Sequence, residues 1–477
     1  MKTIAFLPKI LVTACSLLLT VALTNAQTTW TQIGSDIDGE VASDQSGYSV
    51  SLSSDGTIVA IGARYNAVNG PNTGHVRVWE RNQWGIWTQL GNDIDGEAMA
   101  DQSGYSVSLS SDGSVVAIGA PYNDGNGDQS GHVRVYQNVA GTWTQIGSDI
   151  DGENPGDQSG YSVSLSSDGT IVAIGAPYSR HNQGNLGHVR VYQNIAGTWT
   201  QVGSDIDGEA AGDYSGNSVS LSSDGTIVAI GAYQNNGGAG CVRVYKKNLS
   251  GNWTKIAGDI VGEAENNYSG TSVSLSSDGT IVAIGAPFNS GTGVHAGHVR
   301  VYQNILNTWT QIGNDINGEA AGDESGTSVS LSSDGSMVAI GAYFNNGNWD
   351  QSGHVRIYQN MAGTWTQIGS DIDGEAAGDY SGISVSLSSD GTFVAIGAPY
   401  NEGTGIGGDQ AGHVRIFSDG SLVACKTLPD FNSEVTPAGN QWNTDGPRAI
   451  WNAGCYVYKV HLTIGKTYTF QTGCGNG

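Results

Sequence analysis

Short runs of apolar residues recur along the chain in a fixed order, and the whole set repeats every 54 to 57 residues. In the first copy, residues 49–53 alternate apolar and polar positions, which is typical of a strand with one buried face. Residues 57–63 are apolar at almost every position, which indicates a strand covered on both faces. Residues 74–78 alternate again, and a Trp-Thr-Gln phrase forms a fourth run. The tryptophans that mark the seven copies are Trp30, Trp87, Trp143, Trp199, Trp253, Trp309 and Trp365.

Each copy therefore predicts four strands in one antiparallel sheet. An Asp-Gly pair separates the first two strands, at residues 55–56 in the first copy, and predicts a two-residue hairpin with positive φ at both residues. One such sheet cannot bury two apolar faces alone, but sheets arranged radially around an axis cover one another. Seven copies thus predict an all-β fold, a seven-bladed β-propeller of four-stranded blades. An open solenoid is the alternative, and it would leave an edge strand unpaired.

The order of the strands predicts how the ring closes. The chain after residue 26 begins with a fourth strand at Trp30, and the last copy ends after its third strand at residues 413–417. Pairing these two strands completes the seventh blade with strands from both ends of the chain and removes an exposed edge. The propeller is therefore assigned to residues 27–417.

The repeated phrases have a known counterpart. Residues 159–178 read S-G-Y-S-V-S-L-S-S-D-G-T-I-V-A-I-G-A-P-Y, and G-H-V-R-V-Y follows at residues 187–192. This pattern resembles the FG-GAP repeat family, and the resemblance extends over residues 30–417, about 80% of the chain. The family forms the seven-bladed propeller of integrin alpha subunits and occurs in many secreted bacterial proteins, so the resemblance implies extracellular binding or adhesion.

The chain departs from that family in two places. Ser-Gly stands where the family has Phe-Gly, and the integrin-type calcium loop between the first two strands is shortened to Ser-Ser-Asp-Gly. One Asp cannot supply the roughly six to eight oxygen ligands that Ca²⁺ takes. We therefore expect no calcium in that turn.

Residues 1–26 have the form of a secretory signal peptide. Lys2 and Lys9 precede a mostly apolar segment at residues 10–23, and small residues after this segment supply a cleavage position. Lipoprotein processing at Cys15 is the alternative. No later run reaches the roughly 18 apolar residues of a membrane span. We expect a secreted or cell-surface protein.

The composition excludes several classes of protein. Charged residues make up only 13% of the chain and Gly is frequent, with 72 residues, which favours a folded, strand-rich protein. The net charge is −25, and it is near −27 without residues 1–26, because 44 acidic residues then face 17 basic ones. So acidic a chain repels phosphate, and we expect no nucleic-acid partner. The sequence contains none of the common catalytic motifs, and we expect no enzymatic activity.

Acidic residues cluster after each fourth strand, in variants of the phrase D-I-D-G-E-x-x-x-D. Carboxylates at this density repel one another unless they are hydrogen-bonded, paired with cations or bound to metal. One interpretation is that Ca²⁺ binds at several blades. The other is structural: the Asp side chains accept hydrogen bonds from loop N–H groups, while the Glu pairs with an Arg of a third strand. The metal candidates are Asp36, Asp38, Glu40, Asp44, Asp93, Asp95, Glu97 and Asp101.

Each third strand carries one Arg, and we expect it to form a structural ion pair between blades, because seven identical placements argue against a ligand site. A His two residues earlier recurs in six copies, and Cys241 replaces it in the other copy. We expect no metal at these His residues, because each belongs to a separate blade and no His-x₃-His pair exists.

The loops between second and third strands differ most between copies. Alternating strand directions place them on one face together with the loops that follow the fourth strands, and we call this the top face. Aromatic residues open most of these loops, and they either bind a sugar or a partner side chain or fill gaps between blades. Trp349 breaks the symmetry and is the favoured binding candidate. The ligand-binding candidates are Tyr65, Tyr122, Tyr178, Phe288, Phe344, Trp349 and Tyr400.

The last part of the chain, residues 418–477, leaves the repeat pattern. Its alternating runs predict a partial C-terminal β-sandwich-like module, cut off before a sheet could close, as in a fragment of a longer protein. We expect a disulfide between Cys455 and Cys474.

Together these features predict a monomeric, secreted, non-enzymatic binding or adhesion propeller. It would contact an extracellular protein or glycan through the top face, with Ca²⁺ as the candidate cofactor. One alternative is the substrate-binding or targeting part of a larger extracellular hydrolase, and another is a purely structural surface protein.

Overall fold

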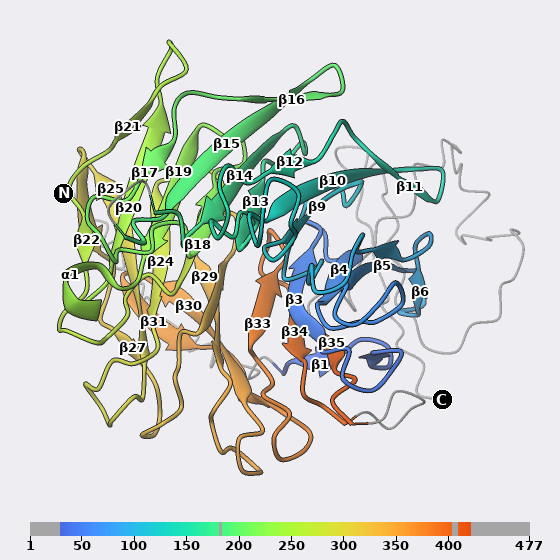
Figure 1. The fold of residues 1–477 in the computed structure, drawn as a ribbon. Coiled ribbons are helices and arrows are strands. Elements are labelled where there is room, and N and C mark those ends of the chain that lie inside the picture. The colour runs from blue at the N-terminus through green and yellow to red at the C-terminus, as the bar shows by residue number, and fades with distance from the viewer. Residues whose placement is uncertain (1–28, 181–183, 403–408, 421–477) are drawn as a thin grey trace, which may run out of the picture.

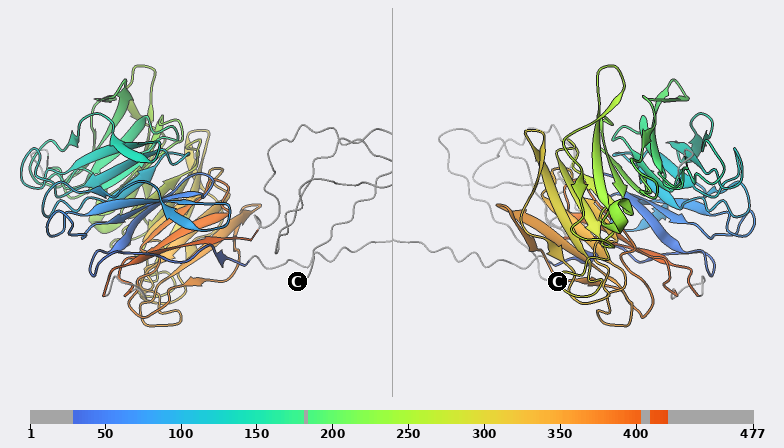
Figure 2. Two further views of the ribbon diagram at one scale, coloured as in Figure 1. Left: turned by 90° about the vertical axis from the view of Figure 1, so that its right-hand side faces the viewer. Right: turned by 60° about the vertical axis from the view of Figure 1, so that its left-hand side comes forward.

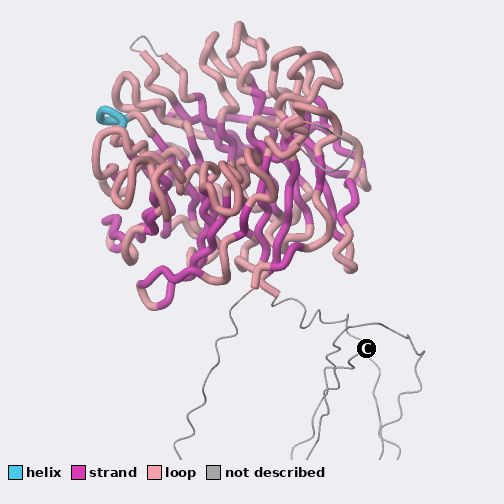
Figure 3. The backbone as a smooth tube through the Cα atoms, turned by 90° about the horizontal axis from the view of Figure 1, so that it is seen from below, coloured by secondary structure: helices cyan, strands magenta, loops and turns pink. Residues whose placement is uncertain are grey.

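A computed structural model describes residues 29–180, 184–402 and 409–420. In this part of the chain, seven antiparallel sheets stand around one axis, and the colours of Figure 1 run around the ring until orange strands meet blue ones. Almost all of it is strand or loop, and the one helix among the described residues is the short α1 (Asn235–Gly238) (Figure 3). The fold is the predicted seven-bladed β-propeller.

The blades share one strand order, and each first strand contacts the first strands of both neighbouring blades around the axis. The first strands are β3 (Ser46–Leu52), β8 (Ser106–Leu109), β13 (Ser162–Leu165), β18 (Ser218–Leu221), β23 (Ser272–Leu275), β28 (Ser328–Leu331) and β33 (Ser384–Leu387). The second strands are β4 (Ile58–Ala63), β9 (Val115–Ala120), β14 (Ile171–Ala176), β19 (Ile227–Ala232), β24 (Ile281–Ala286), β29 (Met337–Ala342) and β34 (Phe393–Ala398). The third strands are β5 (His75–Arg81), β10 (His132–Val139), β15 (His188–Ile195), β20 (Cys241–Lys247), β25 (His298–Ile305), β30 (His354–Met361) and β35 (His413–Ser418).

The fourth strand of every blade is split into two pieces that both pair with the third strand. The first pieces are β6 (Trp87–Gln89), β11 (Thr142–Gln145), β16 (Thr198–Gln201), β21 (Trp253–Lys255), β26 (Thr308–Gln311), β31 (Thr364–Gln367) and β1 (Thr31–Gln32). The second pieces are β7 (Ile94–Asp95), β12 (Ile150–Asp151), β17 (Ile206–Asp207), β22 (Ile260–Val261), β27 (Ile316–Asn317), β32 (Ile372–Asp373) and β2 (Ile37–Asp38). We number the blades 1 to 7 in the order of their first strands.

Blade 7 is closed by strands from both ends of the propeller, as predicted. Strand β1 pairs with β35 through Thr31↔Ser418 and Gln32↔Phe417, and β2 pairs with the start of β35 through Asp38↔His413. Figure 2 shows the blue N-terminal strands against the orange strands of blade 7 from two further sides.

A ring of backbone hydrogen bonds around the axis also shows that the seven blades close. The N–H of Ser54 donates to the carbonyl of Ser111 at 2.8 Å, the same contact follows from each blade to the next, and the N–H of Ser389 returns to Ser54 at 2.9 Å. Next to this ring, the Leu N–H of each first strand donates to a Ser hydroxyl of the preceding blade, as Leu109 does to Ser51 at 3.0 Å. The repeated Ser-Leu-Ser-Ser phrase therefore holds the centre of the propeller together.

The hydrophobic core is divided into seven clusters, each shared by two neighbouring blades. The second strand supplies alternate residues to two clusters: Val172 and Ile174 of β14 face blade 2, while Ile171 and Ala173 face blade 4. This explains why the second strand is apolar throughout. Each Trp of the repeated phrase completes a cluster and donates its Nε1–H to a carbonyl of the preceding blade, as Trp87 does to Ile33 at 2.9 Å.

The Asp-Gly turn differs from the predicted two-residue hairpin. In the first copy only Gly56 has positive φ, at 66°, and Ser53 pairs with Ile58 across a four-residue loop. Asp55 Oδ1 accepts hydrogen bonds from the Ser53 hydroxyl and from the N–H and hydroxyl of Thr57. The Asp side chain thus stabilises a wider turn, and the sequence pair alone did not distinguish the two turn types.

The predicted signal peptide (residues 1–26), most of the C-terminal module (421–477) and the Cys455–Cys474 disulfide lie outside the described residues. No helix in the described ranges is long and apolar enough to cross a membrane.

Candidate functional site

The top face combines the loops between second and third strands with the segments that follow the fourth strands. A chain of half-buried aromatic rings runs along its inner part, with ring centroids 4.8–6.3 Å apart in tilted or edge-to-face pairs. Such geometries are the favourable ones for aromatic pairs. One arc contains Tyr48, Tyr105, Tyr122, Tyr161, Tyr178, Tyr214, Tyr233, Tyr268 and Phe288. A second arc contains Tyr343, Phe344, Tyr380 and Tyr400.

Five of the predicted loop aromatics belong to these arcs, namely Tyr122, Tyr178, Phe288, Phe344 and Tyr400, whereas Tyr65 contacts Arg64. Tyr122 lies against Tyr105, and Phe344 and Tyr400 lie against Tyr380. Each ring therefore has a packing role and keeps a partly exposed surface. Trp349 stands apart from them, with 57% of its surface exposed.

The inner rings were not singled out from the sequence. Tyr48, Tyr105 and Tyr161 follow the Ser-Gly of three neighbouring copies, while other copies have Asn, Thr or Ile at this position. Burial raises the pKa of Tyr105 and of Tyr161, so these hydroxyls stay protonated at neutral pH. The signal that could have identified them is this difference between copies at a repeated position.

Blade 1 adds a cation to the aromatic arc. The Arg64 guanidinium carbon lies 3.5 Å from the centre of the Tyr48 ring and 4.6 Å from that of Tyr65, and its Nε donates to Gln45 at 2.9 Å. Four other copies have Pro at the position of Arg64. A half-buried guanidinium that lies over aromatic rings offers a ligand both stacking and hydrogen-bond donors.

The third-strand arginines form the expected contacts between blades. In six copies the Arg Nη2 donates to a backbone carbonyl of the preceding blade at 2.6–3.0 Å. In the same copies Nη1 lies 3.4–3.9 Å from the Glu that follows that blade. These arginines are 4–6% exposed, so their role is structural.

The acidic candidates have different surroundings. Asp44 and Asp101 are buried, and their Oδ2 atoms accept a loop N–H and an Asn Nδ2–H each, as the structural interpretation expects. Burial raises the pKa of both carboxyls, and these hydrogen bonds oppose the rise. Asp36 and Asp93 accept hydrogen bonds from the Gln of their own fourth strand, at 2.6 and 2.5 Å.

The remaining candidates lie beside the recurring His residues, a grouping that the sequence analysis missed. Asp36 and Asp38 lie with His413, whereas Glu40 lies with His75 and Asp93. Glu97 lies with His132 and Asp149, and Asp95 faces His75 across the strand pair. The residues of one acidic phrase are thus divided between two blades. Sequence spacing could not show this, because the groups form only when the sheets are arranged in the ring.

Burial keeps these imidazoles neutral. Burial and, to a smaller extent, the neighbouring Arg lower the pKa of five of them to about 4, while the nearby Asp opposes the shift. The five are His75, His132, His298, His354 and His413.

These depressed pKa values predict acid destabilisation in metal-free buffer. Stability is fully present above the unfolded pKa of about 6.5 and is lost as the pH falls towards 4, because only the unfolded chain takes up the protons. At pH 5.5 each of these imidazoles should lower the free energy of unfolding by about 1 kcal/mol relative to pH 7.5. Urea unfolding with EDTA at pH 7.5, 6.5 and 5.5 measures the loss. The free energy of unfolding of the variant His75→Gln should fall less steeply with decreasing pH than that of the wild-type protein. Equal slopes in the two proteins would show that protonation of His75 does not contribute to the acid destabilisation.

The opposite end of the axis is uniform. One Leu and one Ser from each blade, Leu52 and Ser54 in blade 1, line a shallow axial cavity. The differences between copies that could select a ligand therefore lie on the top face.

Comparison with known proteins adds the fold and nothing more specific. No protein-family model matches the chain, and no curated protein sequence matches it. Among solved structures, the chain is similar to a Bacteroides uniformis protein that is provisionally named a 6-phosphogluconolactonase. The two share 12% sequence identity with a TM-score of 0.50, over 69% of this chain and 86% of that one. At this identity the likeness concerns the fold alone.

Proposed function

We propose that the chain is a secreted, non-enzymatic binding protein that contacts an extracellular glycan or protein through its top face. The observation that carries this proposal is the combination of Arg64 with Tyr48 and Tyr65, which occurs in one copy of the repeat only. Binding surfaces are enriched in Arg, Tyr and Trp, because these residues supply large contact areas together with hydrogen-bond donors. The resemblance to FG-GAP repeats supports the same class of function.

The scaffold suits such a role. Hydrogen bonds between blades fix the first strands around the axis, so rings at the start of these strands are held in place before a ligand arrives. A surface ordered in advance loses less conformational entropy on binding. Trp349, which is exposed on a loop of blade 6, offers a further aromatic side chain on the top face.

The variants Arg64→Ala and Trp349→Ala should each weaken ligand binding about 5- to 30-fold, as expected for interface residues worth about 1–2 kcal/mol. Glycan arrays and pull-downs from cell surfaces identify the ligand class, and titration of the best ligand gives the dissociation constants. Trp84→Ala is the matched control, because Trp84 is 63% exposed but lies in a turn between third and fourth strands, at the opposite end of the blade.

The outcomes separate the possible functions. Loss of affinity in Arg64→Ala and Trp349→Ala, but not in Trp84→Ala, supports the proposal. If all three variants bind the ligand as tightly as the wild-type protein does, the site is not at Arg64 and Trp349. No signal above background on either platform would contradict a binding function and favour a structural surface protein.

A further inference from the structure

Six blades place a buried imidazole between carboxylates that come from two blades. The His is the first residue of a third strand, one Asp follows the first piece of the fourth strand of the same blade, and the Glu comes from the segment after the preceding blade. One ligand atom from each residue of a group lies within 4.8 Å of the others. The groups include Glu40–His75–Asp93, Glu97–His132–Asp149, Glu153–His188–Asp205, Glu263–His298–Asp315 and Asp36–Asp38–His413.

Two of these imidazoles, those of His75 and His354, have no hydrogen-bond partner although they are buried. His75 is 0% exposed and His354 1%, and neither ring nitrogen of either residue has a hydrogen-bond partner. Buried polar atoms are nearly always paired, so two such rings in equivalent places indicate a missing partner.

The spacing around the imidazoles fits a cation. In five of the six His residues, Nδ1 lies 3.7–4.0 Å from a carboxylate oxygen, which is longer than a hydrogen bond of about 3 Å. The five are His75, His132, His298, His354 and His413. Two ligands bound to tetrahedral Zn²⁺ at about 2.0–2.2 Å are separated by roughly 3.3–3.6 Å. A small inward movement of the half-exposed carboxylates would therefore complete such a site.

Blade 4 supplies an internal comparison. Its His is replaced by Cys241, the Gln of its fourth strand by Lys255, and the Asp opposite the His by Val261. The Lys255 ammonium lies between the two equivalent carboxylates, 2.8 Å from Glu209 Oε1 and 2.7 Å from Asp259 Oδ1. Arg243 also turns to Asp259 and donates from Nε at 2.9 Å. The copy without the imidazole thus places a positive charge of its own at this position.

We infer that the six His-containing blades bind divalent transition-metal ions, with Zn²⁺ or Mn²⁺ as the expected class, through one imidazole nitrogen and the carboxylates of two blades. Imidazole together with carboxylates suits these metals, whereas Ca²⁺ takes oxygen ligands. A metal ion binds imidazole in its neutral form.

The charges at each group agree with this inference. In blade 1, the three carboxylates of Glu40, Asp93 and Asp95 face two positive groups. Arg77 Nη1 lies 3.6 Å from Glu40, and Arg134 acts on Asp95. Burial raises the pKa of Glu40 and of Asp95, and repulsion from Asp93 raises both further. A divalent ion would neutralise this excess negative charge.

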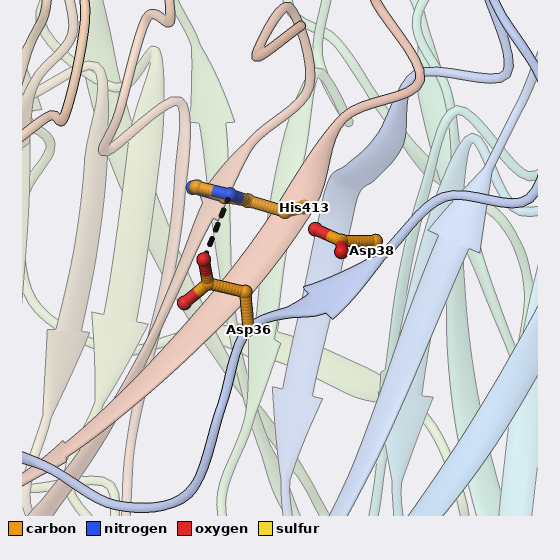
Figure 4. Close-up of side chains that lie close together, drawn as sticks. All are labelled: Asp36, Asp38 and His413. Atoms are coloured by element: carbon orange, nitrogen blue, oxygen red, sulfur yellow. Dashed lines mark ion pairs between the residues drawn. The ribbon is translucent and has the colours of Figure 1, made fainter. Parts of the chain in front are cut away.

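The group in blade 7 has a particular consequence. Figure 4 shows Asp36 and Asp38 approaching His413 from the N-terminal strands, while His413 stands at the start of β35 near the other end of the propeller. His413 Nδ1 lies 4.0 Å from Asp36 and 3.9 Å from Glu375. An ion here would join both ends of the ring and resist its opening. Asp36 and Asp38 thus remain metal candidates, but in a different ligand set from the loop site predicted from the sequence.

The test uses the full mature chain after treatment with EDTA and dialysis. Titration calorimetry and elemental analysis with Zn²⁺, Mn²⁺ and Ca²⁺ measure stoichiometry, and thermal unfolding measures the effect on stability. We expect about six Zn²⁺ or Mn²⁺ ions per chain, one for each His-containing copy, and a higher melting temperature with metal. No binding of either metal, or binding of Ca²⁺ alone, would overturn the inference.

Two variants tie the metal to these residues. The substitution His75→Gln should remove one equivalent of metal. The triple substitution Cys241→His, Lys255→Gln and Val261→Asp rebuilds the site in blade 4 and should add one equivalent. Circular dichroism of both proteins establishes that they fold. Unchanged stoichiometry in two folded variants would overturn the inference even if the wild-type chain binds metal elsewhere.

Discussion

Replacing Trp30 with alanine should lower the free energy of unfolding by about 3–5 kcal/mol, the cost of truncating a large buried aromatic side chain. Trp30 is 8% exposed and packs in the cluster shared by blades 6 and 7, which includes Phe417. Its Nε1–H donates to the Ile368 carbonyl at 3.0 Å, so the residue ties the first strand of the chain to blade 6 as well as to β35. Urea unfolding followed by tryptophan fluorescence or circular dichroism measures the effect.

Deleting residues 29–38 should have a larger effect than the single substitution. The deletion removes β1 and β2, exposes the edge of β35, and also takes the buried Ile37 out of its cluster. We expect loss of cooperative unfolding and aggregation through the unpaired edge. Thr31→Ala is the control, because Thr31 is on the same strand but its side chain is exposed. A truncated chain as stable as the intact one would show that this strand does not close the ring.

The sequence predicts most of the architecture because the repeats encode contacts between neighbouring blades. The repeated Trp, the Ser-Leu-Ser-Ser phrase and the continuous apolar second strand each make the same contact around the ring. A four-stranded sheet with two apolar faces must bury both of them against other sheets, and radial packing around an axis is one of few arrangements that do so. The repeats begin with a spare fourth strand and the last copy lacks one, so the sequence also predicts that the N-terminal strand pairs with β35.

The candidate sites were predicted less well, because their residues meet only across blades. Asp36 and Glu40 belong to one phrase but lie beside His413 and His75, which are on different blades. The split of the fourth strand, which places Asp38 in β2 rather than in a loop, has no signature in strand propensity. The repeat pattern gives no signal for Arg64, because an Arg occurs at this position in only one copy.

The substitution Gly175→Ala should destabilise the protein by about 3 kcal/mol or more, the upper range for overpacking. Gly175 lies in β14, and the Ser162 hydroxyl next to it donates to the Gly216 carbonyl of blade 4 at 2.8 Å. A Cβ atom on Gly175 would overlap that carbonyl oxygen and lie 2.9 Å from the Gly216 carbonyl carbon. The obstacle in blade 4 is the Gly216 backbone, and the Ser162 hydroxyl also lies in the way. Relief therefore requires the two blades to move apart, and equivalent contacts on either side of them resist this movement. Urea unfolding measures the loss.

Gly258→Ala is the matched control for this prediction. A Cβ atom on Gly258 would meet nothing within 4 Å, and its φ lies outside the left-handed region, so the change should stay within about 0.5 kcal/mol of wild type. The repeated Ile-Gly-Ala phrase is thus explained by the distance between blades, since glycine at this position lets the carbonyl of the next blade approach the second strand. If Gly175→Ala and Gly258→Ala are equally stable, the blades are not in contact at this point, and the close packing inferred around the whole ring is wrong.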